Sequence, residues 1–203
     1  MLGFKDIENI YRRLRTVRRY STVPCVVPED VASHLWLVSL IAFNMSKDLS
    51  AESRLKVLSM ALFHDLEEGI SGDIIYPVKR FSPEVKTALD NASQSFVDSL
   101  TANMNNGNNI KDIWNEYKEG ESEEAKIAKV ADIISQTIPM LTEYDMGNSY
   151  SEAIISNMVS HLKDYRCSKD IMSEIIDLIR SKGININESF RYEWANDEAS
   201  ASG

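Results

Sequence analysis

Apolar residues recur along most of the chain at intervals of three and four positions, whereas the alternation typical of strands is nearly absent. The first helix is expected over residues 6–19, and the loop STVPCVVP that follows it contains two prolines that would interrupt a helix. Further helices are predicted over residues 31–45, 51–65, 122–140, 151–165 and 169–181, and another begins at Pro83. The spacing therefore predicts an all-α fold.

Short polar residues mark several of the predicted helix boundaries. Ser50 precedes the segment 51–65, and Ser82 precedes a proline in the first turn of the next helix. The polar run NMNNGNN at residues 103–109 predicts a loop. Within the segment 51–65, Leu55, Leu58 and Leu62 follow helical spacing, so we expect this face to pack against the core.

Length and composition indicate one domain. The chain has 203 residues, of which 43% are hydrophobic. A chain of this size can bury a sizeable core, and we expect a single compact domain over residues 1–195, in which Trp36 and Trp114 are packing residues. Residues 196–203 are small and polar, so a disordered tail is expected there.

The charge and the cysteines exclude several classes of protein. The formal net charge is −9, which argues against a broad surface for binding a nucleic acid polymer. Cys25 and Cys167 have no close partner in the sequence, as is usual for free thiols in a reducing compartment. No segment approaches the roughly 20 apolar residues of a membrane span. A cytoplasmic protein without a membrane segment is therefore expected.

Several polar residues lie within or at the ends of otherwise apolar helices. His34 follows Val31 and precedes Leu35 and Val38, His64 and Asp65 end the segment 51–65, and Asp132 interrupts KIAKVADIIS. One histidine beside an acid is usually an ion pair, but a buried carboxylate is costly unless it is paired or binds a metal. Together the four residues form a nitrogen and oxygen ligand set for one divalent ion, suited to Mn, Fe, Co, Ni or Zn and less suited to Mg.

Two glutamates follow the His-Asp pair. If the helix continues beyond His64, Glu68 lies one turn further on the same face, which makes it a candidate acid or base. Its neighbour Glu67 is interpreted as a solvent-exposed residue at a helix end. Asp132 lies beside the main apolar stripe of its helix, so periodicity alone does not select it.

The order H…HD…D and the segments VRRY, EDVASH, HDLEEGISGDIIYPVK and KVAD resemble the HD-domain metal-dependent phosphohydrolases. The resemblance extends over about residues 10–145 and is strongest to bacterial 5'-deoxynucleotidases and to phage dATP triphosphohydrolases. It implies a compact HD-domain helical bundle in which His34, His64, Asp65 and Asp132 hold one divalent metal ion: Co, Mn, Zn, Ni, Fe or Mg.

The same resemblance implies roles for residues around the metal. Glu68 would position or deprotonate the attacking water, and Arg19 would orient the phosphate. Tyr20 takes a position where relatives often carry tryptophan against the sugar, and Asp73 would accept a hydrogen bond from the sugar 3'-hydroxyl. The remaining implied residues line the nucleoside pocket or add positive charge near the phosphates: Ile74, Ile75, Tyr76, Arg18 and Lys79.

Three functions follow from the resemblance and stay open at this point. The first is a 5'-deoxynucleotidase that removes phosphate from deoxynucleoside monophosphates. The second is a dATP triphosphohydrolase that releases triphosphate, as in phage relatives. The third is a nucleotide-binding HD protein without turnover, against which the intact ligand set counts. In each case the partner is a small deoxyribonucleotide, and a homo-oligomer, either a dimer or a larger ring, is expected in the cytoplasm of a bacterium or a phage-infected cell.

Overall fold

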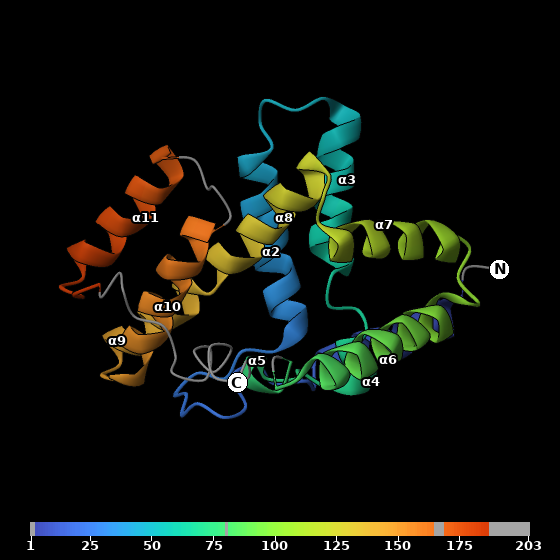
Figure 1. Ribbon diagram of the computed structural model, residues 1–203, viewed down its shortest axis with the longest axis horizontal. Helices are drawn as coiled ribbons and strands as arrows, with labels where there is room; N and C mark the ends of the chain where they lie inside the picture. Colours follow the sequence, from blue (N-terminus) through green and yellow to red (C-terminus); the bar gives the residue numbers. More distant parts are fainter. Residues whose placement is uncertain (1–2, 80, 165–168, 187–203) are drawn as a thin grey trace, which may run out of the picture. The chain divides into compact units, whose positions relative to one another are not determined.

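The computed structural model describes residues 3–79, 81–164 and 169–186. Within these residues the chain forms eleven α-helices and one isolated antiparallel bridge, between Arg18 and Asp30 (Figure 1). The all-α prediction is confirmed. The helices are α1 (Phe4–Leu14), α2 (Val31–Met45), α3 (Ala51–Phe63), α4 (Glu68–Ser71), α5 (Tyr76–Lys79), α6 (Pro83–Thr101), α7 (Gly107–Glu119), α8 (Glu123–Ser135), α9 (Thr137–Asp145), α10 (Tyr150–Asp164) and α11 (Lys169–Ser181).

Contacts divide the chain into two compact units. The first comprises Met1–Thr22 and Pro28–Asp132, and the second comprises Val23–Val27 and Ile133–Gly203. Every residue predicted for the site, from Arg18 to Asp132, belongs to the first unit. The single domain over residues 1–195 stays a prediction, and Cys167 and the tail 196–203 lie outside the described residues. None of the described helices is long and apolar enough to cross a membrane.

Serine and aspartate side chains cap the starts of several helices of the first unit. The Ser50 side chain accepts a hydrogen bond from the Ser53 amide at the start of α3, and Ser82 accepts one from Val85 at the start of α6. Asp30 does the same for α2, where its Oδ1 accepts from the Ser33 amide at 2.9 Å. These caps satisfy amide groups that have no partner inside the helix. The Asp30 cap fixes the start of the helix that carries His34.

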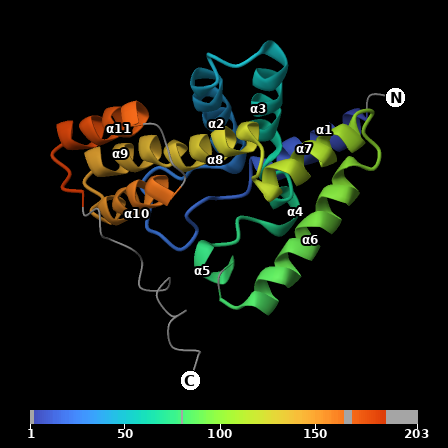
Figure 2. The same ribbon diagram turned by 45° about the horizontal axis from the view of Figure 1, so that its top comes forward.

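Three groups of buried side chains form the core of the first unit. One joins α1 to α2 and Leu66, another joins α2, α3 and α8, and the last joins α3, α7 and α8. Helices α2 and α3 lie side by side, and α7 packs on α3 (Figure 2). The core therefore surrounds the ends of α2, α3 and α8, where the predicted metal ligands lie.

The predicted packing face of α3 is wrong. Leu55 is 65% exposed and Leu62 is 48% exposed, whereas Val57, Met60 and Ala61 are fully buried. Apolar residues lie on more than one side of α3, so helical spacing fits two faces. The smaller Val57 and Ala61 let the helix pack closely on α2 and α8, so that Leu55 and Leu62 stay exposed and Leu58 is only partly buried.

Two predicted helices end earlier than expected. The helix expected over 6–19 ends at Leu14, and the amide of Arg19 donates to the carbonyl of Glu29 in the extended pair with residues 29–30. The helix expected over 122–140 is broken between Ser135 and Thr137. Pro139 explains this break, because a proline has no N–H to donate to the carbonyl four residues earlier, that of Ser135.

A buried carboxylate organises the second unit. Glu143 on α9 is 1% exposed and accepts hydrogen bonds from the amides of Val26 at 2.8 Å and Val27 at 2.7 Å. The Asn148 side-chain amide donates to the same carboxylate and to the carbonyl of Pro24, both at 2.6 Å. The segment 23–27 is thus held against α9 within this unit.

We expect Glu143→Gln to lower the free energy of unfolding by about 2 kcal/mol at pH 7, since a hydrogen bond to a charged group contributes about 1.5–3 kcal/mol. Burial raises the pKa of Glu143, but Asn148 and the two amides outweigh this and hold it below its usual value of 4.5. The charged form is therefore the stabilising one, and its contribution is lost as the pH falls below the usual value. Urea denaturation at pH 7 and at decreasing pH should show the two proteins converging.

The same substitution at the exposed Glu174 on α11 is the matched control and should change the unfolding free energy little at either pH. An equal stability of Glu143→Gln and the unmutated protein at pH 7 would contradict the anchoring role of Glu143.

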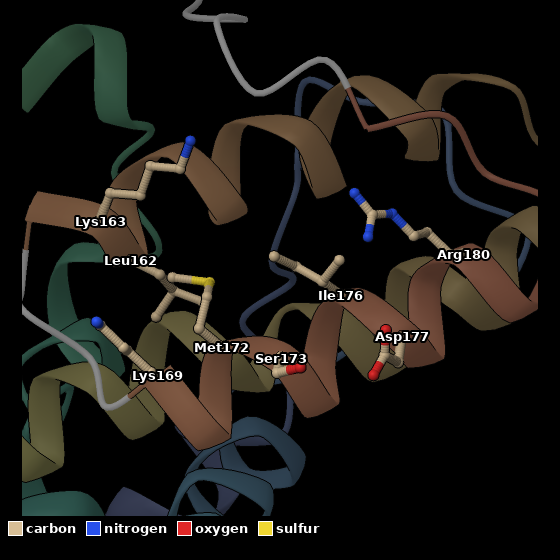
Figure 3. A pocket seen from close by; sticks show the side chains of 8 residues that line it. All are labelled: Leu162, Lys163, Lys169, Met172, Ser173, Ile176, Asp177 and Arg180. Atoms are coloured by element: carbon tan, nitrogen blue, oxygen red, sulfur yellow. The ribbon is translucent and has the colours of Figure 1, made fainter.

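A cavity of about 440 Å³ also belongs to the second unit, between α10 and α11 (Figure 3). None of the residues predicted for the site lines it. Its lining residues are Leu162, Lys163, Lys169, Met172, Ser173, Ile176, Asp177 and Arg180.

Candidate metal centre and its surroundings

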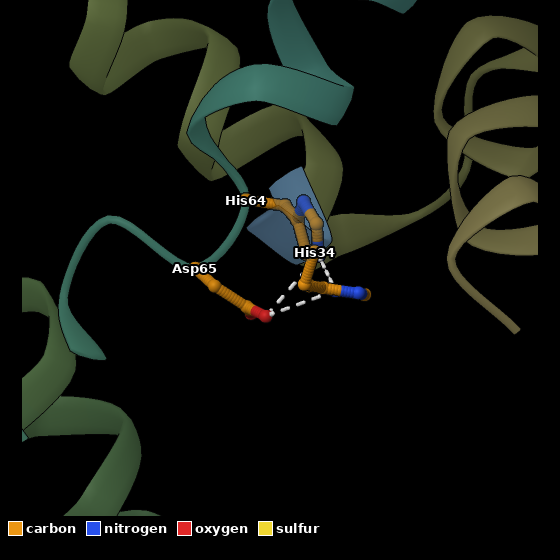
Figure 4. A group of neighbouring side chains, drawn as sticks. All are labelled: His34, His64 and Asp65. Carbon is orange, nitrogen blue, oxygen red and sulfur yellow. Dashed lines mark hydrogen bonds and ion pairs between the residues drawn. The ribbon is translucent and has the colours of Figure 1, made fainter. Parts of the chain in front are cut away.

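The side chains of His34, His64, Asp65 and Asp132 meet in the first unit. The Nε2 atoms of the two histidines lie 3.3 Å apart. Oδ2 of Asp65 lies 3.2 Å from Nε2 of His64 and 3.6 Å from Nε2 of His34 (Figure 4). Oδ1 of Asp132 lies 3.2 Å and 3.7 Å from the Nε2 atoms of His34 and His64, respectively. The four residues that the sequence selected are therefore together in space.

Local structure explains the direction of each imidazole. His34 lies in the first turn of α2, on the buried face with Val31, Leu35 and Val38, and is fully buried. His64 is the C-cap of α3, and its Nδ1 lies 2.9 Å from the carbonyl oxygen of Ala61. An Nδ1–H that donates to this carbonyl leaves the Nε2 lone pair pointing at the cluster, which is a common arrangement for histidine ligands.

The pKa values of the two histidines shift in opposite directions. Burial and the nearby Arg19 lower the pKa of His34 to about 4, so this imidazole is neutral. Burial also lowers the pKa of His64, but the carboxylates of Asp65 and Asp132 outweigh burial and raise it to about 10. Burial raises the pKa values of Asp65 and Asp132, yet the histidines hold both below the usual range. Without a metal ion, Nε2 of His64 therefore carries a proton beside the carboxylates, and a cation bound by the same residues would displace that proton.

These donors fit a single divalent ion. Ligand atoms about 2.1 Å from one tetrahedral centre lie about 3.4 Å from one another, and the separations that involve a histidine Nε2 run from 3.2 to 3.7 Å. One donor atom from each of His34, His64 and Asp65 lies within 4.8 Å of the others. Neutral imidazoles and ionised carboxylates are the protonation states that metals bind.

Arg19 lies against the cluster. Its guanidinium contacts Nδ1 of His34 and lies 3.3 Å from Oε2 of Glu29, with both of these charged side chains largely buried. Burial lowers the pKa of Arg19, but the neighbouring Tyr20, Asp132 and Glu29 raise it by more. The net effect is a pKa above the usual value, so the guanidinium stays charged. The sequence did not single out Glu29 as a partner, and no local pattern would have done so.

Tyr20 and Asp73 are neighbours beside Arg19. Tyr20 has a left-handed backbone with φ 56°, which is uncommon for a residue other than glycine. Its backbone amide donates to the Asp73 carboxylate. Its hydroxyl is buried and has no hydrogen-bond partner among the described residues. Burial raises the pKa of both side chains, whereas Arg19 lowers both.

Glu68 reaches the cluster by a different route from the one predicted. Helix α3 ends at Phe63, a turn follows, and Glu68 is the first residue of α4. The helix does not persist because Leu66 and Glu68 donate their amides to carbonyls three residues earlier. Glu68 is 5% exposed, and its Oε2 has no hydrogen-bond partner within the described chain.

Charge and burial both act on Glu68. Burial, Asp65 and Asp73 raise its pKa to about 9, against the lowering effect of Lys79 and Arg19. The Lys79 ammonium lies 3.7 Å from Oε1. Because repulsion from Asp65 is one cause of the shift, neutralising Asp65 would lower the pKa of Glu68 towards the range in which it accepts a proton. Glu68 is therefore a buried carboxyl beside the cluster that can exchange a proton.

The other predicted site residues whose side chains are described are exposed or partly exposed. Arg18 is exposed, whereas Arg19 is partly buried. Ile74 and Ile75 are partly exposed between α4 and α5, and Lys79 is 48% exposed. Tyr76 begins α5, but its side chain lies outside the description.

The prediction that Glu67 is solvent-exposed is wrong. Glu67 is 4% exposed and accepts hydrogen bonds from the Trp114 indole at 2.9 Å and from Lys118 at 2.7 Å. Both donors come from α7, almost 50 residues away in the sequence. A glutamate at a helix end is usually exposed to solvent. Glu67 is buried because α7, which is distant in the sequence, packs over it.

Curated relatives have named activities. A 5'-deoxynucleotidase of Dictyostelium discoideum is 29% identical over 138 residues, which cover 64% of this chain and 71% of the relative. A 5'-deoxynucleotidase of Pasteurella multocida is 24% identical over 188 residues, covering 87% and 93%. A dATP triphosphohydrolase of Salmonella phage PMBT28 is 31% identical over 104 residues, covering 47% and 53%.

Solved structures and a family model agree on the fold. An HD-domain phosphohydrolase of Listeria innocua superposes with a TM-score of 0.71 at 20% identity, over 91% of this chain and 92% of that one. The HD phosphohydrolase of cyanophage S-2L, solved with dA and one catalytic Zn²⁺, superposes with a TM-score of 0.58 at 17% identity, over 91% and 98%. The family model described as the HD domain matches residues 11–195. The chain therefore belongs to the HD-domain family.

Proposed function

We propose that the protein is a metal-dependent phosphohydrolase of 2'-deoxyribonucleotides, and specifically a 5'-deoxynucleotidase that converts deoxynucleoside monophosphates into deoxynucleosides and phosphate. One observation carries the proposal. The Nε2 atoms of His34 and His64 lie 3.3 Å apart and 3.2 to 3.7 Å from a carboxylate oxygen of Asp65 and of Asp132, beside the buried Oε2 of Glu68, which has no hydrogen-bond partner among the described residues.

The four converging residues would hold one divalent ion. Their mixed nitrogen and oxygen donors favour Mn, Fe, Co, Ni or Zn over Mg. When bound, such an ion lowers the pKa of a coordinated water and neutralises charge on phosphoryl oxygens. The cyanophage relative solved with a catalytic Zn²⁺ supports this assignment.

The surrounding side chains would bind the substrate and move a proton. Arg19, held by Glu29, offers paired N–H donors to a phosphate. Glu68 would take the proton of the attacking water as general base. Asp73 would accept a hydrogen bond from the sugar 3'-hydroxyl, while the Tyr20 ring crowds the 2' position.

The remaining substrate contacts are proposed from position. Ile74, Ile75 and Tyr76 would line the nucleoside pocket, and Lys79, which reaches Glu68, would add positive charge. Arg18 is proposed to meet further phosphates, although its exposed position makes it the weakest member of this group.

Cleavage of monophosphates is the first choice because the Pasteurella nucleotidase matches nearly the whole chain. The second candidate is release of triphosphate from dATP, which the phage relative supports over a shorter stretch and the dA-bound cyanophage structure supports for the base. The third is a nucleotide-binding protein without turnover, for which the complete ligand set would have no purpose.

A homo-oligomer, dimeric or in a larger ring, is part of the proposal. Helix α2 is apolar on nearly all sides, and Trp36, predicted to pack, is 66% exposed on one face with Leu40 and Phe43. A helix that is hydrophobic all round is normally buried, which supports a second copy on this face. We further propose that the protein acts in the cytoplasm of a bacterium or phage-infected cell, where deoxyribonucleotides are used for DNA synthesis.

An assay of products tests the function. The protein, incubated with Mn²⁺ or Co²⁺ and each deoxyadenosine mono-, di- and triphosphate, is expected to release inorganic phosphate from dAMP, and to act more slowly on AMP. Chromatography identifies the released group. Asp65→Ala, purified in the same way, is the control for contaminating phosphatases.

Other outcomes separate the alternatives. Release of intact triphosphate from dATP would show that the protein is a dATP triphosphohydrolase and not a 5'-deoxynucleotidase. Equal kcat/KM for dAMP and AMP would remove the claim of deoxyribose selection. If no product is released from any nucleotide with any of these metals, the remaining candidate is a nucleotide-binding protein without turnover.

A further inference from the structure

Helix α7 contains no residue of the predicted site, yet its last two turns contact the site at several points. The Trp114 indole N–H lies 3.1 Å from the carbonyl oxygen of His64 and 2.9 Å from Oε2 of Glu67. The Tyr117 hydroxyl lies 3.3 Å from Oδ2 of Asp132. Helix α7 packs on α3 in the first unit, so these contacts lie within one compact body (Figure 2).

The two carboxylate oxygens of Asp132 have different partners. Oδ1 faces the Nε2 atoms of His34 and His64, while Oδ2 accepts from the Tyr117 hydroxyl. The Tyr117 ring also lies 5.1 Å from the His64 ring, centre to centre. Tyr117 is 6% exposed. One side chain from α7 thus contacts two of the four candidate ligands, and it contacts the Asp132 oxygen that does not face the histidines.

Trp114 holds the turn that carries His64 and Asp65. This turn follows the end of α3 and lacks the continuous hydrogen bonds of a helix. The indole N–H lies between the His64 carbonyl and the Glu67 carboxylate, and Lys118 donates to the other oxygen of Glu67 at 2.7 Å. The Lys118 ammonium also lies 4.9 Å from the centre of the Trp114 ring. The turn is thereby tied to α7 by hydrogen bonds at both of its ends.

We propose that Tyr117 and Trp114 are positioning residues of the metal centre: Tyr117 orients the Asp132 carboxylate, and Trp114 fixes the turn that presents His64 and Asp65. The inference rests on the proposed metal-dependent function. Hydrogen-bond partners behind metal ligands fix ligand orientation, and their loss typically weakens metal binding by about 10- to 100-fold. A site also needs its ligands held within about 0.5 Å of the binding geometry.

Simple packing is the competing explanation. Tyr117→Phe removes one hydroxyl oxygen and keeps the ring, so a packing role predicts unchanged metal affinity. Trp114→Phe keeps an aromatic ring but removes the N–H. The controls are Tyr11→Phe and Lys86→Gln, because Tyr11 is 61% exposed and the Lys86 side chain is 68% exposed in the same unit.

The test is titration of the metal-free proteins with Co²⁺, followed by calorimetry and visible absorption. We expect Tyr117→Phe and Trp114→Phe each to weaken Co²⁺ binding by about 10- to 100-fold, with both controls unchanged. The visible bands, which report the Co²⁺ geometry, should shift in Tyr117→Phe. Thermal melting of the metal-free proteins checks folding, and Lys118→Gln replaces Trp114→Phe if that variant does not melt cooperatively.

Co²⁺ affinities of these variants within twofold of the unmutated protein would overturn the proposal, as would equal weakening by the two controls. Co²⁺ titration needs no nucleotide. A protein that binds Co²⁺ but hydrolyses nothing would therefore overturn the proposed activity while the positioning role is still decided by the affinities. No Co²⁺ binding by the unmutated protein would overturn both.

Discussion

Replacement of Asp132 by alanine is expected to reduce hydrolysis below detection and to remove the bound metal. The Asp132 carboxylate is the contribution of α8 to the cluster, with Oδ1 at 3.2 Å from Nε2 of His34 and 3.7 Å from Nε2 of His64. Without it, two imidazoles and Asp65 would have to hold the ion with one negative charge instead of two. Metal content after dialysis, measured by mass spectrometry, and the rate of phosphate release check the prediction.

The fold should survive this change. Ala128 and Ala131, the buried neighbours of Asp132 on α8, keep their packing, so the helical circular dichroism signal should persist. Asp48→Ala, at an exposed aspartate of the same unit, is the control and should retain both metal and activity. Asp132→Ala with full metal content, or the unmutated protein with full activity in the presence of a chelator, would contradict the assignment.

The sequence could predict those features of the fold that depend on neighbouring residues. The caps at Ser50 and Ser82 and the helical class follow from local spacing and hydrogen bonding, and the structure agrees. Proline at position 139 contained the signal for the break after Ser135, although the apolar stripe of that segment obscured it. On α3, spacing alone could not decide between two apolar faces, because the choice depends on the shapes of α2 and α8.

The candidate site was likewise only partly predictable from neighbouring residues in the sequence. His34, the pair His64 and Asp65, and Asp132 are polar residues within or at the ends of apolar helices, and only the four together predicted a ligand set, because one histidine beside an acid is usually an ion pair. Asp132 interrupts an apolar segment but lies beside its main stripe, so periodicity alone did not select it. The structure brings it to the cluster because the end of α8 lies beside α2 and α3.

The contacts of α7 with the site could not be predicted from local pattern. Trp114 and His64 are 50 positions apart, as are Lys118 and Glu67 to within one. The hydrophobic spacing of one segment carries no information about its contacts with the other. Each of these residues, taken alone, resembles a packing residue or a surface residue. Contacts of this kind depend on the packing of α7 against α3, which is a property of the assembled unit.

Glu68→Gln is expected to lower kcat by about 10²- to 10⁴-fold, the usual contribution of general acid-base catalysis, with metal content and KM nearly unchanged. Glutamine has the size of glutamate but cannot accept the proton of the attacking water. The side chain is 5% exposed, and Oε2 has no hydrogen-bond partner in the described part of the chain, so its structural contribution is small. Steady-state kinetics at saturating Co²⁺, with metal content measured on the same sample, separate the two effects.

Glu119→Gln, on the exposed end of α7, is the matched control and should leave both kcat and metal content unchanged. Loss of metal together with activity in Glu68→Gln would assign Glu68 to metal binding instead of proton transfer, and an unchanged kcat would remove it from the reaction. The pKa near 9 sharpens the test. Burial and repulsion from Asp65 and Asp73 raise this pKa. A cation bound by Asp65 would lower it and so favour the ionised form of Glu68. The part of the rise of kcat with pH that comes from ionisation of Glu68 should be absent in Glu68→Gln.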